Sequence, residues 1–376
     1  MPDYAQLSVG DHAPWFKARS PSNERYTFNT AGGRWVLMAF LGSAGAEVGA
    51  AMWKTAMSMR PAFDDSRIAL FAVTIDPADE AEGRIRQSMP GVRIFWDFDG
   101  KVGKLYGALP QDWQPGTPAE MRPLWVLLDP TMRIAGMWPH GPGEAEMRAA
   151  VAALPDVDLA TGVEIMAPIL YLPRVFEPEL CHALIAAYDK AGGEISGFMV
   201  ERDGKTHLAY DDGHKTRRDH LLEDDNLIAA TRARIRRRIA NEIKKVHAFE
   251  VTRMERFLVG CYTAEDKGHF RPHRDNTTPG TAHRRFAVSI NLNSEFEGGQ
   301  IGFPEYGTRT FKPPPGGAVV FSCSLLHVVT PVTAGRRYAF LPFLYDEAAA
   351  KVREANNATL VGTAPYSATG GQPAAA

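Results

Sequence analysis

The hydrophobic pattern of this 376-residue chain changes part-way along its length. Up to about Leu154, short apolar runs alternate with amphipathic stretches, which is typical of an α/β layer fold. Further along, short strands follow one another through turns rich in glycine and proline, as in a sandwich or double-sheet jelly roll. A chain of this length is also long for a single core. The sequence therefore predicts two domains, over residues 1–158 and 166–348, and a disordered tail over residues 349–376.

Apolar runs and their periodicity predict the individual elements. In the first domain we expect strands over 35–41, 68–75, 92–96, 124–128 and 134–138, and helices over 47–63, 78–88 and 144–154. In the second domain we expect strands over 169–176, 252–262, 285–293, 300–303, 308–311, 318–322 and 338–345, and helices over 178–191 and 227–246. The polar segment 196–225 shows weak periodicity and is interpreted as a long loop.

Charge and cysteine content narrow the class of protein. The formal net charge of -2 gives no global attraction to nucleic acid or to an anionic membrane, and we expect neither as a partner. The basic face of helix 227–246 is interpreted as a solvated surface, with a nucleic-acid patch as the less favoured alternative. Cys181, Cys261 and Cys323 are odd in number and widely spaced, which favours a reducing compartment over a disulfide framework or zinc cluster. Because no leader-like start and no long apolar run is seen, we expect a cytoplasmic protein.

Two histidines and a carboxylate stand in a pattern that suits a metal ion. His273 and Asp275 are two residues apart, so on an extended strand both side chains project to the same side. His327 follows the apolar strand 318–322, and the set of two imidazoles and one carboxylate holds non-haem Fe(II) while leaving one face open. Arg337 begins the next strand, where its guanidinium would form a bidentate pair with a carboxylate inside a barrel. Tyr262 would donate its phenol to the same carboxylate.

Other polar residues near these positions have plainer interpretations. His269 is expected to pack beside the motif without ligating a metal, since sites of this kind use two histidines. Arg336 is expected to point outward because its neighbour Arg337 points inward. Cys261 and Cys323 are interpreted as small buried hydrophobes. The polar residues of segment 196–225 are interpreted as solvated, with substrate contact as the alternative. They are His207, His214, Arg217, Arg218, Asp219 and His220.

Five short segments of the first domain match one known family. They are Val9–Phe16, the strand 36–41, Asp76-Pro77, Asp99-Gly100 followed by Leu105-Tyr106-Gly107, and Leu124–Asp129. Together they resemble a peroxiredoxin of the thioredoxin fold. Peroxiredoxins carry a reactive cysteine just after the first core strand, where a helix N-terminus lowers the pKa of the thiol. This chain has Gly42-Ser43-Ala44-Gly45-Ala46-Glu47 there, and its first cysteine is Cys181. We therefore expect a non-catalytic domain for docking, dimerisation or substrate presentation. Arg122 stands where the family has an active-site arginine, and without the thiolate it is expected to be a surface or capping charge.

A second set of segments matches another family. It comprises Pro178–Leu184, Tyr262, Gly268–Asp275, Leu292–Gly299, Pro315–Phe321 and His327–Arg337. Together they resemble the double-stranded β-helix domain of the Fe(II)- and 2-oxoglutarate-dependent oxygenases, in the branch similar to prolyl 4-hydroxylases. The resemblance implies His273, Asp275 and His327 as iron ligands, and Arg337, assisted by Tyr262, as partner of the C5 carboxylate of 2-oxoglutarate. It also implies O2 as co-substrate and allows ascorbate as an accessory reductant. Since relatives that halogenate lack the carboxylate found here at Asp275, hydroxylation of a C–H bond is expected, with release of succinate and CO2.

These observations lead to one architecture and two functions of different kinds. The expected fold is an α/β thioredoxin-like N-terminal domain followed by a double-stranded β-helix (jelly roll) with flanking helices. The leading function is a dioxygenase that hydroxylates a prolyl residue, an amino acid or a related small-molecule or peptide substrate. The alternative is a non-catalytic sensor or adaptor that binds metal and 2-oxoglutarate and recruits a partner through the thioredoxin-like domain. Peroxide reduction ranks low because the thiol is missing, and any homodimer is expected to form through the N-terminal domain.

Overall fold

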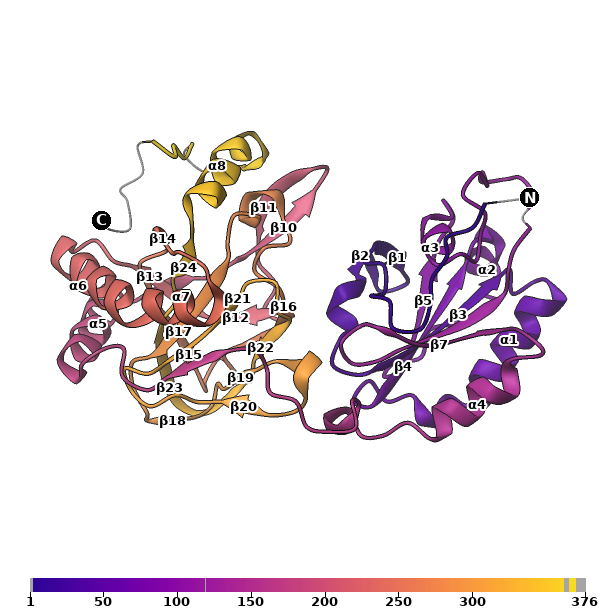
Figure 1. Ribbon diagram of the computed structural model, residues 1–376, viewed down its shortest axis with the longest axis horizontal. Coiled ribbons are helices and arrows are strands. Elements are labelled where there is room, and N and C mark those ends of the chain that lie inside the picture. The colour runs from indigo at the N-terminus through magenta and orange to yellow at the C-terminus, as the bar shows by residue number, and fades with distance from the viewer. Residues whose placement is uncertain (1–2, 119, 362–364, 370–376) are drawn as a thin grey trace. The chain divides into compact units, whose positions relative to one another are not determined.

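A computed structural model describes residues 3–118, 120–361 and 365–369 of the chain. Two compact units are present in it (Figure 1). The first comprises the described residues up to Met166 together with Pro304–Thr308, and the second comprises the remainder. The change of unit after Met166 falls in the turn-rich stretch of the sequence. Among the described residues, no helix combines the length and the apolar character needed to cross a membrane.

A seven-stranded sheet forms the centre of the first unit, in the order β2-β1-β5-β4-β3-β6-β7. Strands β3, β4 and β5 are parallel, and β6 and β7 continue the sheet in antiparallel fashion. The strands are β1 Lys17–Ser20, β2 Asn23–Thr27, β3 Trp35–Gly42, β4 Ile68–Thr74, β5 Val92–Trp96, β6 Leu124–Leu128 and β7 Ile134–Pro139. The last five match the expected runs closely, whereas the β1–β2 hairpin was not expected because its residues are polar and partly exposed.

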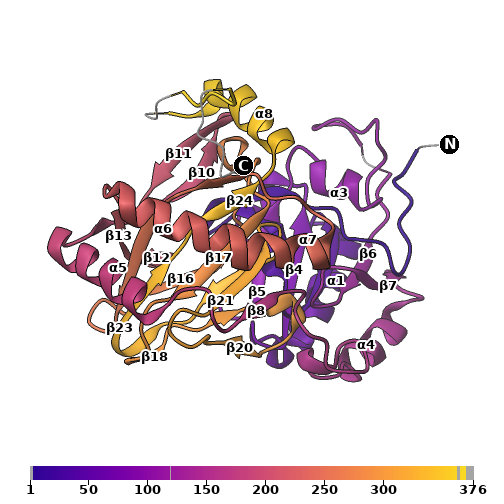
Figure 2. The same ribbon diagram turned by 60° about the vertical axis from the view of Figure 1, so that its left-hand side comes forward.

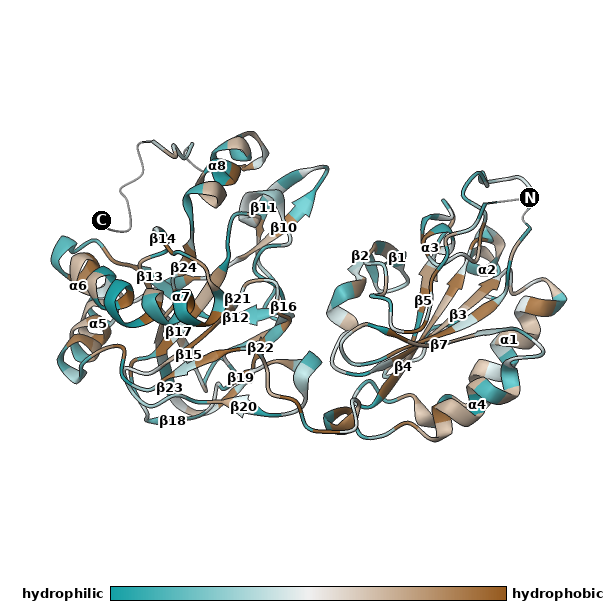
Figure 3. Ribbon diagram, viewed as in Figure 1, coloured by the Kyte–Doolittle hydropathy of each residue, from teal (hydrophilic) through white to brown (hydrophobic). Residues whose placement is uncertain are grey.

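Helices cover both faces of this sheet. They are α1 Glu47–Ser58, α2 Pro77–Ala81, α3 Lys101–Leu105 and α4 Glu144–Ala152. All eight residues of β3 are buried, and alternate ones face opposite sides: Leu37 packs with α1 and α4, and Met38 packs with α3. Figure 3 shows β3, β4 and β5 as largely hydrophobic ribbons, as expected for strands buried on both faces. Helix α2 is shorter than the expected 78–88, because Gly83 follows it with a left-handed φ of 63°.

Two sheets form the second unit as a double-stranded β-helix. The larger follows the order β14-β24-β17-β23-β15-β13-β9, with β21, β18 and β8 attached, and the smaller follows β12-β16-β22-β19-β20. The strands are β8 Leu170–Leu172, β9 Glu194–Ile195, β12 Lys215–Thr216, β13 Arg218–Leu221, β14 Arg253–Glu255, β15 Leu258–Thr263, β16 His269–His273, β17 Phe286–Asn291, β18 Phe296–Gly298, β19 Ile301–Gly302, β20 Thr310–Phe311, β21 Ala318–Ser322, β22 His327–Val329, β23 Val332–Phe340 and β24 Phe343–Tyr345. A separate hairpin comprises β10 Phe198–Arg202 and β11 Lys205–Ala209.

Three helices cross the outer face of the larger sheet (Figure 2). They are α5 Pro178–Ala191, α6 Asp225–Ile235 and α7 Asn241–His247, the last two joined by a π-helical turn. Helix α5 has the expected bounds, with proline at its start and Gly192 at a left-handed φ of 87° after its end. Leu184 and Ile239 are fully buried against Val288 and Ile290 of β17. One face of β17 therefore builds the core under the helices, and its other face is free to line the space between the sheets.

Three expectations for this unit need correction. The segment 196–225 is not a loop, because main-chain pairing turns it into the β10–β11 hairpin, β12 and β13. Residues 252–262 form two strands, because Arg256 takes a left-handed φ of 65° between β14 and β15. Strand β23 begins earlier than expected, and Pro342 separates it from β24.

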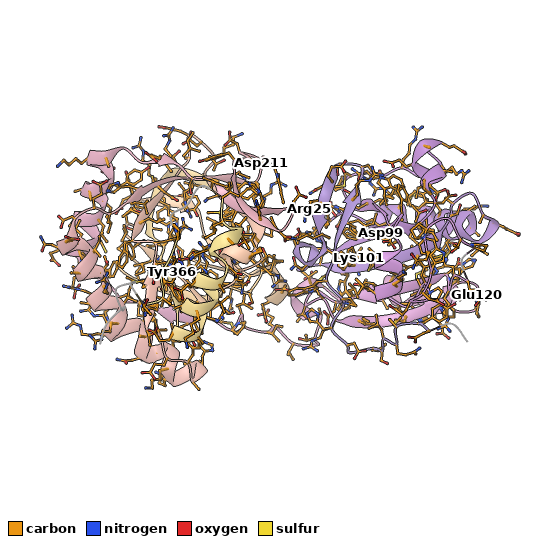
Figure 4. The ribbon with its side chains drawn as sticks, turned by 90° about the horizontal axis from the view of Figure 1, so that it is seen from above. Arg25, Asp99, Lys101, Glu120, Asp211 and Tyr366 are labelled. Carbon is orange, nitrogen blue, oxygen red and sulfur yellow. The ribbon has the colours of Figure 1, made fainter. Side chains whose placement is uncertain are left out.

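The expected disorder after residue 348 is also contradicted where the chain is described. Helix α8 spans Glu347–Ala355, with Asp346 capping its N-terminus by accepting from the Ala349 N–H. Tyr366, labelled in Figure 4, packs against Ala349 and Ala350 and lies under the guanidinium of Arg353, 4.1 Å from its ring centre. The helix was not predicted because the sequence here is rich in alanine. Alanine favours helix and fits a close contact, but it gives no strong apolar periodicity. Residues 362–364 and 370–376 of the expected tail lie outside the described residues.

The turn at Gly298 offers a test of backbone strain. Its φ is +69°, and an added Cβ would lie 2.0 Å from the Pro331 carbonyl oxygen. We expect Gly298→Ala to lower the free energy of unfolding by about 2–5 kcal/mol, from left-handed strain plus steric overlap. Gly204 is the matched control, because its φ is +72° but nothing lies within 4 Å. Gly204→Ala should cost about 1–2 kcal/mol. Urea unfolding of both variants measures the difference, and equal losses would mean that the contact with Pro331 is relaxed at no cost.

Candidate metal site and its carboxylate anchor

Three residues from two paired strands form a compact cluster. Strand β16 ends at His273 and β22 begins at His327, and these two residues are direct partners in the antiparallel register. Asp275 follows β16, where its backbone N–H donates to the Cys323 carbonyl at 2.9 Å. Its carboxylate oxygens lie 3.6 Å from His273 Nε2 and 3.4 Å from His327 Nε2. The fold thus brings together the three residues singled out in the sequence, with their donor atoms all within 4.8 Å of one another.

Both imidazoles are oriented with Nε2 toward the cluster. Nδ1 of His273 lies 2.7 Å from the Arg271 carbonyl oxygen, and Nδ1 of His327 lies 3.0 Å from that of Leu325. A carbonyl oxygen only accepts hydrogen bonds, so each Nδ1 carries a proton and each Nε2 faces Asp275. Burial lowers the pKa of His273 to about 4, and therefore this ring is neutral at pH 7. Two imidazoles facing one carboxylate fit a non-haem Fe(II) ion by the chemistry of the donor set.

Asp275 is the anionic member of the cluster. Burial opposes its ionisation, but the adjacent rings of His327 and His273 hold the pKa of its carboxyl below the ordinary value. Phe270 stacks on the His273 ring, with centroids 3.4 Å apart and planes at 21°, and this contact fixes the ring from the strand side. A rotation of His273 would disturb both this stack and its Nδ1 hydrogen bond.

Arg337 on β23 is the buried cation expected near the cluster. Only 1% of the residue is exposed, its Nε donates to Asn291 Oδ1 at 3.0 Å, and its Nη2 donates to Ser289 Oγ at 2.8 Å. Its Nη1 is buried without a hydrogen-bond partner among the described residues. An unpaired buried donor of a charged group is costly, and a carboxylate would satisfy it. Arg337 therefore fits the carboxylate of a co-substrate such as 2-oxoglutarate.

The two residues that hold Arg337 by hydrogen bonds were not predicted from the sequence. Ser289 and Asn291 lie on the inward face of β17, alternating with the apolar residues that face the helices. Two polar residues at alternate positions in an otherwise apolar strand could have indicated them. Tyr262 is the direct strand partner of Arg337, whose guanidinium carbon lies 5.3 Å from the Tyr262 ring centre. The phenol oxygen accepts a hydrogen bond from Arg217 Nη1 at 3.2 Å.

A second group of buried charges lies beside Tyr262. Arg217 donates to both carboxylate oxygens of Asp219, at 2.6 and 2.7 Å, and its Nη2 donates to Ser196 Oγ at 3.2 Å. Lys215 Nζ donates to Ser196 Oγ and to the Gly197 carbonyl oxygen, both at 2.6 Å. Sequence reasoning treated Arg217 and Asp219 as solvated and did not single out Lys215 or Ser196. This segment has no apolar periodicity, so nothing in its pattern indicated that its charged residues are buried.

The neighbouring residues take the positions expected of them. The Arg336 side chain is 57% exposed, in contrast to that of Arg337. His269 is bonded through Nδ1 to the Lys267 carbonyl oxygen and is not part of the metal-binding cluster. Cys181, Cys261 and Cys323 are buried free thiols.

The first unit has no thiol where a peroxiredoxin would carry one. Ser43 Oγ donates to Asp76 Oδ2 at 2.6 Å, and the Ala44 N–H donates to Asp79 Oδ2 at 2.8 Å. Arg84 pairs with both of these aspartates. The turn before α1 is thus closed by an ion-paired network. Arg122 lies over the Tyr4 ring, 3.5 Å from its centre.

A two-sheet barrel with a His-Asp-His cluster is the architecture of the double-stranded β-helix oxygenases. Residues 257–345 match the family described as the 2OG-Fe(II) oxygenase superfamily, and residues 9–136 match the AhpC/TSA family. The chain thus joins an AhpC/TSA-type thioredoxin-like domain to a 2OG-Fe(II) oxygenase domain. The Arg337-containing strand and the whole triad lie inside the 257–345 match.

Similar proteins come from several bacteria. A PKHD-type hydroxylase of Cupriavidus metallidurans is 39% identical over 80 residues, which cover 19% of this chain and 35% of the relative. The PKHD-type hydroxylase PiuC of Pseudomonas aeruginosa is 27% identical over 202 residues, covering 51% of this chain and 83% of the relative. A Pseudomonas putida prolyl-4-hydroxylase structure aligns with TM-score 0.37 and 18% identity, covering 50% of this chain and 95% of that one. A thiol peroxidase from Chromobacterium violaceum aligns with TM-score 0.33 and 13% identity, covering 40% and 90%. The family matches and the hydroxylase relatives support an oxygenase- or hydroxylase-type enzyme.

Asp219 is expected to be important for stability. Asp219→Asn leaves the Arg217 guanidinium buried without its carboxylate, and we expect a loss of about 3–5 kcal/mol in the free energy of unfolding at pH 7. Burial opposes ionisation, but Arg217 lowers the pKa of Asp219 from 3.8 to about 2. Its carboxylate therefore stabilises the fold above about pH 4, and this contribution fades as the pH falls toward 2.

The difference between wild type and Asp219→Asn should accordingly narrow below about pH 4. Urea unfolding at a series of pH values measures it. The exposed Asp212, in the same segment, provides the control, and Asp212→Asn should change stability by less than about 0.5 kcal/mol. Equal stability of the two variants at pH 7 would show that the Arg217–Asp219 pair has no net role.

Proposed function

We propose that this protein is an Fe(II)- and 2-oxoglutarate-dependent dioxygenase that hydroxylates a C–H bond of a prolyl residue, an amino acid or a related substrate, with release of succinate and CO2. One observation carries the proposal: the His-Asp-His cluster and a buried arginine with an unpaired Nη1 occur in one barrel. The metal-binding cluster alone would suit many reactions. The unpaired arginine adds a demand for a carboxylate, which 2-oxoglutarate meets.

Each residue has a distinct part in this proposal. His273, Asp275 and His327 hold the iron, which with 2-oxoglutarate supplies the O2-dependent oxidation of an unactivated C–H bond. Arg337 binds the C5 carboxylate through Nη1, while its Nε and Nη2 stay bonded to the barrel wall. Tyr262 lies beside that guanidinium and positions it. The barrel places these groups on rigid strands, which favours an accurate approach of co-substrate and metal.

The test uses the full-length protein loaded anaerobically with Fe(II). Binding of 2-oxoglutarate should produce a metal-to-ligand absorption band, and admission of O2 should give slow succinate release even without primary substrate. A protein that shows the band but never releases succinate, with any substrate, would be the sensor or adaptor. A protein that shows neither, and that does not change when His273 is replaced by alanine, would refute both functions.

We further propose that the thioredoxin-like domain is non-catalytic and serves docking, dimerisation or substrate presentation. The segment that stands where a peroxiredoxin carries its reactive cysteine has no thiol, and its Ser43 is hydrogen-bonded to Asp76, which supports this. The full chain, free of iron and supplied with a thiol reductant, should consume hydrogen peroxide no faster than its Cys181→Ser variant. The Cys181 thiol is buried and belongs to the other unit, so its removal should not change the rate. Peroxide consumption that saturates with enzyme-like kinetics would contradict the proposal.

A further inference from the structure

Lys215 is a buried ammonium group that the proposed function does not use. The residue is 5% exposed, and its Nζ donates only to neutral acceptors, Ser196 Oγ and the Gly197 carbonyl oxygen. Within the described parts of the chain, no carboxylate pairs with it. An ammonium has three N–H donors, so one remains for a further partner. Burial lowers the pKa of Lys215 well below its ordinary value. A carboxylate beside the amine would favour its charged form, so an anionic partner suits this site.

Lys215 lies on β12, which pairs with β16, the strand that ends at His273 of the cluster. Strand β12 pairs with β16 so that Lys215 is opposite Phe270, and paired residues share a face of the sheet. The ammonium lies 5.0 Å from the Phe270 ring centre, and the same ring stacks on His273. Phe270 packs with Tyr262 and Val329 in the barrel interior. Lys215 is therefore separated from the first histidine of the cluster by a single aromatic ring.

A charge count singles out Lys215 among the cations of the barrel. Lys215, Arg217, Arg256 and Arg337 bring four positive charges to this part of the barrel, and Asp219 brings one negative charge. Asp219 is held by Arg217 through two hydrogen bonds. The C5 carboxylate of 2-oxoglutarate would neutralise Arg337. Ferrous iron, Asp275 and the remaining carboxylate of the co-substrate sum to zero. Arg217 and Arg256 both contact Asp219, so with Arg337 paired to the co-substrate, Lys215 is the cation of this group that contacts no carboxylate of the described residues.

We propose that Lys215 binds a carboxylate of the primary substrate, and that the protein hydroxylates carboxylate-bearing small molecules, such as free amino acids, in preference to residues inside a peptide chain. This inference rests on the proposed function and names its substrate class. An internal peptide residue presents a neutral amide at the corresponding place, which cannot compensate a buried ammonium. Ser196 positions Lys215, because its hydroxyl joins the ammonium to Asp219.

The experiment compares acids with their amides in wild type and variants. Succinate release by the Fe(II)-loaded full chain is measured with the common L-amino acids and their carboxamides, beginning with L-proline and L-prolinamide. In wild type, at least one amino acid should stimulate succinate release, and the KM for its carboxamide should be at least about 30-fold higher. Lys215→Met should raise the KM for that acid by a similar factor and remove the preference over the amide, while Lys215→Arg restores part of it. Lys205→Met is the matched control, since Lys205 is exposed on the adjacent hairpin.

A second readout separates this role from a purely structural one. The Kd for 2-oxoglutarate, measured anaerobically from the absorption band, should be the same within about 3-fold in wild type and in Lys215→Met. The melting temperature shows whether the variant is folded. A variant that is folded but binds 2-oxoglutarate weakly would make Lys215 a co-substrate anchor and overturn the inference. So would an undiminished preference for the acid in Lys215→Met, or a wild type stimulated by no acid. If wild type itself binds no 2-oxoglutarate, the proposed function fails, and this inference with it.

Discussion

Replacing His327 by alanine is expected to abolish iron-dependent turnover of 2-oxoglutarate. His327 is 5% exposed and is paired directly with His273 across the two strands, so no other side chain in the described barrel offers a third donor at this place. Loss of groups that merely orient a ligand costs 10- to 100-fold in metal affinity or activity, and loss of a ligand should cost more than about 100-fold. Succinate release and bound iron per chain, measured after desalting, should fall together.

His269 provides the control for this substitution. It lies on the same strand as His273, but its ring is bonded to the Lys267 carbonyl oxygen and is not a member of the cluster. His269→Ala should keep both the iron content and the rate of succinate release within about 3-fold of wild type. Retention of iron by His327→Ala together with its loss from His269→Ala would place the metal elsewhere and refute the assignment.

Part of the His-Asp-His cluster was predictable from the sequence because its spacing is local. His273 and Asp275 are two residues apart, and that spacing survives whatever the fold around it. His327 and Arg337 are distant along the chain, and their assignment depended on a family resemblance rather than on periodicity. The register of β16 with β22 and of β15 with β23 brings them into place. Strands such as β3 and β17 were equally predictable, since long apolar runs leave few alternatives.

The remainder could not be predicted because it depends on tertiary pairing. Lys215 and Arg217 lie in a polar segment without period, yet both are buried when β12 and β13 pair with strands from elsewhere in the chain. Whether such a segment forms a strand depends more on the strands it pairs with than on its own residues. Helix α8 was missed for a related reason, since its few buried residues are alanines. The site residues that sequence analysis missed are therefore those whose burial is imposed by distant strands.

Arg337→Met should weaken 2-oxoglutarate binding without removing iron. The substitution keeps much of the aliphatic bulk between the sheets but deletes the buried guanidinium with its free Nη1. Truncating one partner of a buried charge pair costs about 2–5 kcal/mol, so the Kd for 2-oxoglutarate should rise by about 30-fold or more. Arg337→Lys should recover little, because an ammonium lacks the planar fork that reaches Asn291, Ser289 and a carboxylate at once.

Arg336 gives the matched comparison, since it is the adjacent arginine on the same strand but has an exposed side chain. Arg336→Met should leave both iron content and the Kd for 2-oxoglutarate within about 2-fold of wild type. Anaerobic titration of the absorption band measures Kd, and the amount of iron retained distinguishes loss of the anchor from loss of the metal. If Arg337→Met and Arg336→Met bind 2-oxoglutarate equally well, the unpaired Nη1 is not the carboxylate anchor. The co-substrate would then have to be held by another cation of the same barrel, and Lys215 is a buried candidate that contacts no carboxylate in the described part of the chain.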